Sequence, residues 1–559
     1  MKKEYYLELM EKALSAYPYA HIERYFNDVK KNGLTEHGFP RLTANIGILI
    51  AHGRRKDLLP IFMEMMDFCC HTIPRVKAAN DFSVKEIIFC IMELERTDVV
   101  SSDDIARWKG NLATIEAESC YNIYARSVDE KPNNWALFTA LSEYMRMYAG
   151  LGGEEEFIDI QIATQLKRLD ENGMYMDSSK DVGQPIVYDL VPRGLFAVML
   201  HFGYRGKYFD EIDACLKKAG LLTLSMQSVT GEIAFGGRSN QFIHNEAHLA
   251  IIMEYEAKRY AKEGNTALAK KFKEGVERAL EDVARWLDKD PIRHVKNRFA
   301  TETKYGCEKY AYFDKYMITA ASFLYVAYLI CDESIEAADG AFVAPEVFAT
   351  SHHFHKVFAR CGEYGIEIDT NGSPSYDASG LGRVHRRGAP SAICLSLPCP
   401  AVPNYTIDAD DAISFSLCPA VKRNGDWFFG AGEDTKYELT RLEKNDNSAF
   451  ADFNCIFDDG YKVSLSYTVS DNGVEIGISG EDEIAYALPA FSFDGENYTE
   501  IETDGHTLTV RYLGWECKYT TDGKISELGK NARNRNGHYR TFYASAEKKL
   551  NIKIEIVKG

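Results

Sequence analysis

The sequence predicts a two-domain protein, in which an N-terminal (α/α)6-type toroid (residues 1–335) precedes a C-terminal antiparallel β-sandwich (residues 336–559). Up to about residue 330, apolar residues recur every three or four positions, which is the period of helices. After about residue 340 they recur at every second position, which is the period of half-buried strands. At 559 residues the chain is long enough for two or three domains with substantial cores.

About a dozen helices account for the first domain. The segment LFAVMLHFG (195–203) is apolar nearly all round, as inner helices are, whereas TALAKKFKEGVERALEDVARWL (266–287) is amphipathic and suits an outer layer. Alternation of the two kinds in about six hairpins favours a toroid over a helical solenoid, because no fixed-period repeat is present. The predicted helices are the opening residues and the ranges 42–53, 56–73, 83–97, 102–115, 133–150, 154–169, 188–203, 208–226, 242–264, 266–287 and 314–330.

The second domain is predicted from short alternating or β-branched runs that are separated by turn signals such as Asp-Asn-Gly and Asp-Gly. This pattern is typical of a sandwich of antiparallel strands. The acidic stretch 331–346 is the predicted linker. The predicted strands are 364–370, 392–398, 412–417, 461–469, 473–480, 507–521 and 550–557.

The composition excludes several classes of function. A net charge of −18 argues against a general nucleic-acid binder, which needs a basic face, and an anionic ligand would need a local cationic pocket. No window of 18 apolar residues is present, so no membrane span is expected. The 13 cysteines form no metal-knuckle or disulfide pattern, and the opening residues lack the apolar core of a secretory signal. We therefore expect reduced thiols in a cytoplasmic protein.

Two consecutive amides, Asn133 and Asn134, precede the apolar run that begins at Trp135. One Asn is a common helix N-cap, and capping is the plain structural explanation. A cap does not need the second amide, and amide donors at the positive end of a helix can hold a carboxylate. We therefore predict that these three residues bind substrate.

Tyr188 and Arg193 lie at the start of another apolar helix, after the chain breakers Gly183 and Pro185. A tyrosine hydroxyl is rarely buried without a partner, so Tyr188 is either a structural residue or a functional one. Arg193 follows little more than one helical turn later and is predicted to share the Tyr188 end of a pocket. Packing is the alternative role for this arginine.

The densest group of hydrogen-bonding side chains in the helical half lies in FGGRSNQFIHNEAHLA (235–250). His244 is predicted to stand at the rim of an active site. His244 and His248, one turn apart, could instead hold a metal, but Glu246 does not fall where a zinc protease needs its glutamate. Substrate binding is predicted for Arg238, Asn240 and Gln241.

A second polar cluster opens the strand-rich half, where four histidines fall within about 35 residues. The segment 351–390 carries five Lys or Arg against four acids, which sets it apart in a chain of net charge −18, and a solvated loop is the alternative explanation. No cofactor is required, although the histidines leave room for a structural divalent metal. The four histidines are His352, His353, His355 and His385. Substrate binding is predicted for His353 and Arg383, and also for Tyr312 in the preceding segment.

These stretches together resemble polysaccharide lyases built from an (α/α) toroid and an antiparallel β-sandwich, the group of the heparinase II/III-like and oligoalginate-lyase-like enzymes. In that group an Asn-Asn-His motif opens an inner helix, a tyrosine follows some 55 residues later, and a histidine of the first sandwich strands completes the site. Here NNW (133–135), Tyr188 and His385 fall in that order. Trp135 stands in place of the family histidine, so the base must come from elsewhere, and His244 is the candidate. In overall appearance the chain is also similar to the lyases that remove rhamnose from glucuronic acid, polysaccharide lyase family 27.

The resemblance implies cleavage at C4 of a uronic acid by β-elimination. This reaction removes the hydrogen at C5, which is too weakly acidic until the neighbouring carboxylate is neutralised. Amides such as Asn134 would neutralise the carboxylate, and Tyr188 would act as acid and also as base if a cation such as His385 favoured its phenolate. The expected substrate is an imported oligosaccharide, cut from its end, with glucuronate favoured. Whether the chain forms a homo-oligomer is left open.

Two other functions compete with this interpretation. A glycoside hydrolase on the same toroid would need two carboxylic acids that face each other across a cleft. The candidates for such a pair are Asp177, Asp189, Glu246 and Glu302. A non-catalytic carbohydrate-binding protein would equally suit the 12% of aromatic residues.

Overall fold

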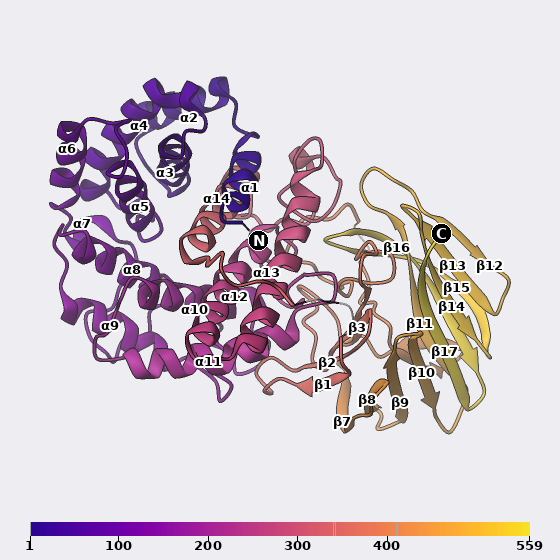
Figure 1. Ribbon diagram of the computed structural model, residues 1–559. Coiled ribbons are helices and arrows are strands. Elements are labelled where there is room, and N and C mark those ends of the chain that lie inside the picture. The colour runs from indigo at the N-terminus through magenta and orange to yellow at the C-terminus, as the bar shows by residue number, and fades with distance from the viewer. Residues whose placement is uncertain (1, 339, 341–342, 410–411) are drawn as a thin grey trace.

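The computed structural model describes residues 2–338, 340, 343–409 and 412–559. Helices form the first part of the chain and antiparallel sheets the second (Figure 1), as the sequence predicts. The last helix of the first part, α14, ends at Ile330, and the first strand, β1, begins at Glu346. The predicted division at 335/336 falls between them, within the predicted linker 331–346; of that linker, residues 339, 341 and 342 lie outside the described residues.

Six inner helices form a closed ring. Each packs against the next, and the ring closes where α14 packs against α3. These helices are buried over most of their circumference, because they face both the centre of the ring and the outer layer. The inner helices are α3 (Gly38–Ala51), α5 (Val84–Leu94), α8 (Trp135–Tyr148), α10 (Ile186–His201), α12 (His244–Lys262) and α14 (Phe313–Ile330).

An outer layer of helices surrounds this ring (Figure 1). It consists of α1 (Glu4–Leu14), α4 (Leu59–Thr72), α6 (Ser102–Leu112), α9 (Glu155–Leu166), α11 (Phe209–Met226) and α13 (Thr266–Leu287). Two helices were not predicted, α2 (Tyr19–Asn32) and the short α7 (Ala117–Cys120). The helix α2 buries Ile22, Phe26 and Val29, which share one face at helical spacing, so the sequence carries a signal for this helix that was overlooked.

The second part of the chain contains three antiparallel sheets among the described residues. The larger two share one core and form the sandwich. One has the strand order β12 (Glu500–Thr503), β13 (Thr507–Tyr512), β14 (Trp515–Thr521), β17 (Lys549–Lys558), β10 (Gly473–Ser479), β9 (Lys462–Ser470), β8 (Ser448–Phe457) and β7 (Thr435–Lys444). The other has the order β15 (Lys524–Asn534), β16 (Gly537–Ala546), β11 (Ile484–Phe493), β5 (Pro419–Arg423) and β6 (Asp426–Phe429).

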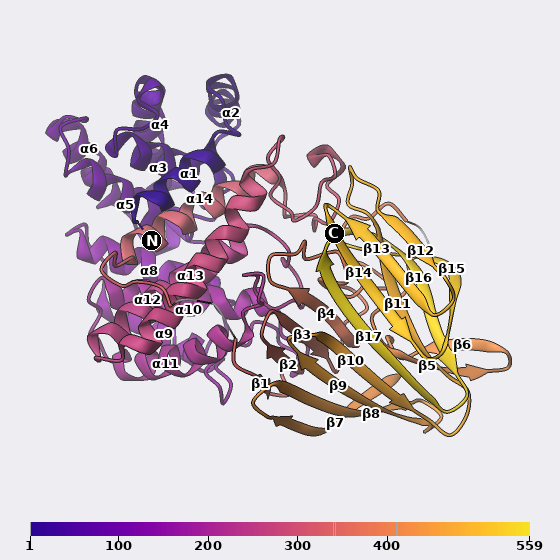
Figure 2. The same cartoon turned by 45° about the vertical axis from the view of Figure 1, so that its right-hand side comes forward.

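The third sheet lies between the helical ring and the sandwich (Figure 2) and packs against β8 and β9. It consists of β1 (Glu346–Ala349), β2 (Lys356–Cys361), β3 (Tyr364–Asp369) and β4 (Gly380–Arg386).

The two predicted strands 392–398 and 412–417 are wrong. Both segments are at least half-buried, but they form only isolated bridges, such as the one between Val384 and Leu395. The first segment ends at Pro398, which has no backbone N–H with which to continue a ladder, whereas Pro419 after the second segment begins β5.

Buried ion pairs join the helical and strand-rich parts. Arg535, in the β15–β16 turn, donates to Glu308 at 2.6 Å, and both side chains are almost fully buried. Arg383 of β4 pairs in the same way with Glu232 of the helical part at 3.8 Å. A buried charge that loses its partner is strongly destabilising, so these contacts hold the two parts together. No helix of the described chain is both long and apolar enough to cross a bilayer.

Candidate functional site

A cavity of about 360 Å³ opens at one end of the helical ring. Four of its lining residues stand in the first turn of four different inner helices, because the ring brings the N-terminal ends of these helices to the same mouth. Helix N-termini carry partial positive charge, so this end of the ring attracts anions. The four residues are Trp135 of α8, Tyr188 of α10, His244 of α12 and Lys315 of α14.

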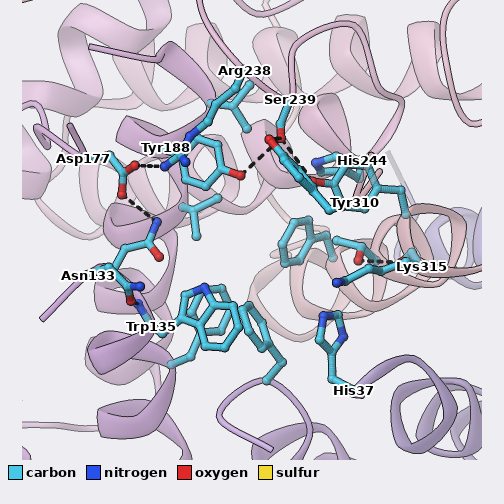
Figure 3. A pocket seen from close by; sticks show the side chains of 18 of the residues that line it. His37, Asn133, Trp135, Asp177, Tyr188, Arg238, Ser239, His244, Tyr310 and Lys315 are labelled. Atoms are coloured by element: carbon cyan, nitrogen blue, oxygen red, sulfur yellow. Dashed lines mark hydrogen bonds and ion pairs between the residues drawn. The ribbon is translucent and has the colours of Figure 1, made fainter. Parts of the chain in front are cut away.

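Tyr188 points into this cavity (Figure 3). Its hydroxyl lies 3.1 Å from the Ser239 hydroxyl, and the guanidinium of Arg238 lies over its ring, 4.1 Å from the centroid. Burial raises the pKa of Tyr188 above its ordinary value, while Arg238 and the Ser239 hydrogen bond act in the opposite direction. The phenol is therefore protonated at neutral pH and can donate a proton.

Asp177 connects two other walls of the cavity. One carboxylate oxygen accepts a hydrogen bond from Asn134 Nδ2 at 3.0 Å, and the other accepts from Arg238. Burial raises the pKa of Asp177, and the charge of Arg238 counteracts this. Asp177 therefore holds Arg238 against Tyr188 and fixes the Asn134 amide at the start of α8.

The Ser239 hydroxyl lies among three tyrosine hydroxyls. Besides Tyr188, Tyr310 lies 3.2 Å and Tyr316 3.1 Å from its oxygen. The backbone of Ser239 has φ +58°, a left-handed conformation that non-glycine residues seldom adopt. Its N–H donates to the buried Glu308 carboxylate at 2.6 Å, which stabilises this conformation. The hydroxyls form a connected polar network beside Tyr188.

His244 is a neutral imidazole on the same wall. Its ring lies edge-on to Tyr316 at a centroid distance of 4.6 Å, and its buried Nδ1 has no hydrogen-bond partner among the residues that the structure describes. Burial lowers the pKa of His244 well below its ordinary value, and the neighbouring His248 and His294 add to this effect. A neutral imidazole can accept a proton, so His244 is available as a base, and the lowered pKa makes it a weaker base than a solvated histidine.

The lining carries three cations, Arg41, Arg238 and Lys315, against one carboxylate, Asp177. Arg41 is paired with Glu86 at 2.9 Å, and Arg238 with Asp177. Lys315 forms no ion pair within the described chain, although burial lowers the pKa of its ammonium group. Figure 3 shows Lys315 across the cavity from Asp177. Within a chain of net charge −18, this is the local cationic pocket that an anionic ligand would need.

The structure brings six of the predicted site residues to this cavity, and they are Asn133, Asn134, Trp135, Tyr188, Arg238 and His244. The indole of Trp135 lies edge-on to Phe82, with ring centroids 4.9 Å apart. Together these two rings give the cavity an aromatic wall of the kind on which a sugar can pack.

Arg193 does not share the Tyr188 end of the cavity. It is fully buried and donates from Nε to Asp189 at 2.9 Å and from Nη2 to Thr223 of α11 at 2.8 Å. Five residues along a helix turn a side chain to the other face, so Arg193 points toward the outer layer while Tyr188 points inward. This position fits the alternative prediction for Arg193, a role in packing inside the helical domain.

His385 also lies away from the cavity. It is buried in β4, with Nδ1 2.6 Å from the Ser228 hydroxyl and Nε2 3.3 Å from the Ser396 hydroxyl. Burial lowers the pKa of His385 to about 3. This ring is therefore neutral, and it supplies no positive charge to favour a Tyr188 phenolate.

The remaining predicted site residues are not among the cavity lining either. Arg383 pairs with Glu367 at 3.1 Å, and Asn240 donates to the Ala234 carbonyl at 3.0 Å. The Gln241 carbonyl accepts from Asn536 of the strand-rich part at 3.1 Å, which is an interdomain contact. Tyr312 is 39% exposed at the start of α14, and His353 contacts Asp181.

Several lining residues were missed from the sequence. Lys315, Tyr310 and Tyr316 belong to the segment that enters α14, and His37 precedes α3. The sequence feature that could have revealed some of them is their position relative to the predicted helix starts. Polar residues in the first turn of each apolar helix would have identified Lys315 and Tyr316, since a closed ring places the N-termini of the inner helices together. Tyr310 and His37 precede their helices.

No family model matches the sequence, and no curated protein matches it. Among solved structures, the chain is similar to heparinase III, with 8% identity over 86% of this chain and 69% of that one, at a TM-score of 0.43. It is similar to chondroitin AC lyase from Streptomyces coelicolor A3, with 10% identity over 99% and 83% of the two chains, at a TM-score of 0.45. A polysaccharide lyase aligns with 12% identity over 58% of this chain and 96% of its own, at a TM-score of 0.36. Similarity at this level carries no functional conclusion, so the function is inferred from the cavity.

Proposed function

We propose that this protein is a carbon–oxygen lyase that cleaves a uronic-acid oligosaccharide by β-elimination. The observation that carries the proposal is the juxtaposition in one cavity of a protonated Tyr188, a neutral His244 and the unpaired ammonium group of Lys315. Together they offer an acid, a base and a charge that can neutralise a carboxylate, which are the three requirements of this reaction.

Carboxylate binding is assigned to the side of the cavity that holds Lys315. Its ammonium group lines the cavity and forms no ion pair in the described part of the chain, although the charge of Glu36 acts on it. The N-termini of the inner helices add to the positive potential. Asn133 stands at the entrance to α8 and can donate from its amide, because its carbonyl oxygen already accepts from Trp135 N at 3.0 Å. Neutralising the uronate lowers the barrier to removal of the C5 hydrogen.

Proton transfer is assigned to His244 and Tyr188. The neutral imidazole of His244 takes the C5 proton, and the Tyr188 phenol donates its proton to the departing glycosidic oxygen at C4. The C4–oxygen bond breaks as the C4–C5 double bond forms, so no redox cofactor takes part. The Ser239 hydroxyl, 3.1 Å from the Tyr188 oxygen, can stabilise the phenolate that results.

A hydrolase with paired carboxylic acids fits this cavity poorly. Of the four acids considered, only Asp177 is among the described residues that line it. Asp189 is paired with Arg193 and Glu246 with Lys296 in buried ion pairs, and Glu302 lies on a short 3₁₀ helix outside the lining. One acid cannot supply both roles of a hydrolytic pair.

A cavity of about 360 Å³ is at the small end of the range for ligand sites and suits the end of a short oligosaccharide, so we assign exo action. Glucuronate is the favoured uronic acid. All 13 cysteines are free and buried, which suits a reducing compartment, and we assign the protein to the cytoplasm.

The test is incubation with glucuronate-, galacturonate- and mannuronate-containing oligosaccharides while the ultraviolet absorbance of the unsaturated product is followed. A rise in absorbance with one of these substrates is the expected result. New reducing ends without absorbance would identify a hydrolase. Binding without either signal would identify a carbohydrate-binding protein, and both of these outcomes overturn the proposal.

A further inference from the structure

Two loops from different parts of the molecule meet near the surface and present two histidines and one aspartate. Asp181 lies in the loop before α10, and His352 and His353 lie in the loop between β1 and β2. The ligand atoms of the three side chains all lie within 4.8 Å of one another. No other group of three or more His, Cys, Asp or Glu in the described chain has this spacing.

Each histidine lies at about the ligand-to-ligand spacing of a tetrahedral metal site from one oxygen of the Asp181 carboxylate, and the two histidines face different oxygens. His352 Nε2 lies 3.2 Å from one carboxylate oxygen of Asp181, and His353 Nδ1 lies 3.3 Å from the other. Bonds of about 2.0–2.1 Å in a tetrahedron hold neighbouring ligand atoms about 3.3–3.4 Å apart. Imidazole and carboxylate together suit zinc rather than calcium or magnesium, which prefer oxygen ligands alone.

We propose that Asp181, His352 and His353 form a zinc site that links the loop before α10 to the β1–β2 loop. His352 and Asp181 are 63% and 76% exposed, so an ion can enter and a water molecule can complete the tetrahedron. The two histidine rings already lie together, with centroids 3.8 Å apart. His353 Nδ1 also lies 2.7 Å from the Asp181 carbonyl oxygen, a contact that zinc would replace.

The two loops are held in register without the ion. Gln184 N donates to the His353 carbonyl at 3.1 Å, and the Gln184 side chain accepts from Ser178 N at 2.8 Å. The loop that carries Asp181 runs from Asp177 to α10. It therefore connects Asp177, which binds Arg238, to the helix that carries Tyr188. Zinc binding would therefore rigidify the segment between Asp177 and Tyr188.

Zinc chloride titrated calorimetrically into the full chain tests the site. We expect one ion per chain and a raised melting temperature, because a ligand that binds only the folded state stabilises it. Asp181→Asn and His352→Ala should each weaken binding at least about tenfold. All three ligands are near the surface, so these variants should fold like the parent protein.

Controls separate this site from general zinc uptake. His71→Ala removes an exposed histidine from α4 and should leave zinc binding unchanged, and the 13 buried cysteines are not accessible to the ion in the folded protein. Magnesium chloride should produce no comparable heat. Absence of stoichiometric zinc binding, or equal binding by the parent protein and the Asp181→Asn variant, would overturn the proposal. Neither readout depends on catalytic activity.

Discussion

The guanidinium of Arg238 lies over the aromatic ring of Tyr188, 4.1 Å from its centroid. This contact places a positive charge against the π face of a tyrosine whose pKa burial would otherwise raise further. Arg238 is held there by Asp177, which also binds Asn134. Burial keeps the phenol protonated at neutral pH, and Arg238 stabilises the negative charge that appears when the phenol donates its proton.

Replacement of Tyr188 by Phe removes the proposed acid while keeping the ring under Arg238. We expect kcat to fall by about 10²- to 10⁴-fold, the usual contribution of a general acid, with little change in binding affinity. The measurement is the initial rate of unsaturated product formation, together with calorimetric binding of the same oligosaccharide.

Tyr312→Phe is the matched control, because Tyr312 is exposed and lies outside the described cavity lining. Its kcat should equal that of the parent protein. If Tyr188→Phe retained full activity, Tyr188 would be a structural residue and the assignment of the acid would be wrong.

The fold could be predicted because the apolar residues change from the helical period to the strand period at one point of the chain. The all-round apolar helices become the inner ring, and the amphipathic helix α13 lies in the outer layer. The helix α2 was overlooked although its buried residues have helical spacing, and two strands were wrongly predicted in apolar runs that form only isolated bridges. Apolar spacing along a segment does not show whether that segment finds a partner strand.

The site was predicted only in part, for a geometric reason. Residues at helix starts, such as Asn134, Tyr188 and His244, converge because the ring places those ends together. The orientation of a side chain within a helix depends on the position of the outer layer, which the sequence does not give. Arg193 was therefore assigned to a cavity that it does not reach. His385, which lies on β4, was assigned from the family resemblance and is held by Ser228 away from the cavity.

Replacement of Lys315 by Met removes the unpaired charge from the cavity. We expect KM for a uronate oligosaccharide to rise by about 10- to 100-fold, since a hydrogen bond to a charged group contributes about 1.5–3 kcal/mol. Lys315→Arg should restore much of the affinity. Lys271→Met on the exposed face of α13 is the control. A KM that is unchanged in Lys315→Met would place the carboxylate elsewhere.

The activity should depend little on pH around neutrality. His244 must be neutral to act as a base, and burial lowers its pKa well below 6.5, so the acid limb of kcat/KM should lie below that value. Tyr188 must be protonated, and burial raises its pKa above 10, so the basic limb should lie above that value. An acid limb at or above pH 6.5 would exclude His244 as the base.

The stability of the folded protein should fall in acid, because histidines that are buried in the neutral form take up protons more readily in the unfolded chain. The pKa of His248 is lowered to about 3, as is that of His385, whereas an unfolded histidine binds its proton at about 6.5. The unfolded chain therefore binds more protons as the pH falls from 6.5 toward 3, and each such histidine lowers stability by about 1.4 kcal/mol per pH unit. Circular dichroism at each pH separates this loss from a catalytic effect.

Replacement of Arg193 distinguishes a role in stability from a role in substrate binding. Replacement by Met leaves the fully buried Asp189 carboxylate without its cation, which typically costs about 3–5 kcal/mol. We expect a large fall in unfolding free energy in urea but an unchanged KM at a temperature where the variant remains folded. In an Asp189→Asn background the same replacement should be less destabilising, because no buried negative charge is then left unpaired. A raised KM with unchanged stability would instead return Arg193 to the substrate site.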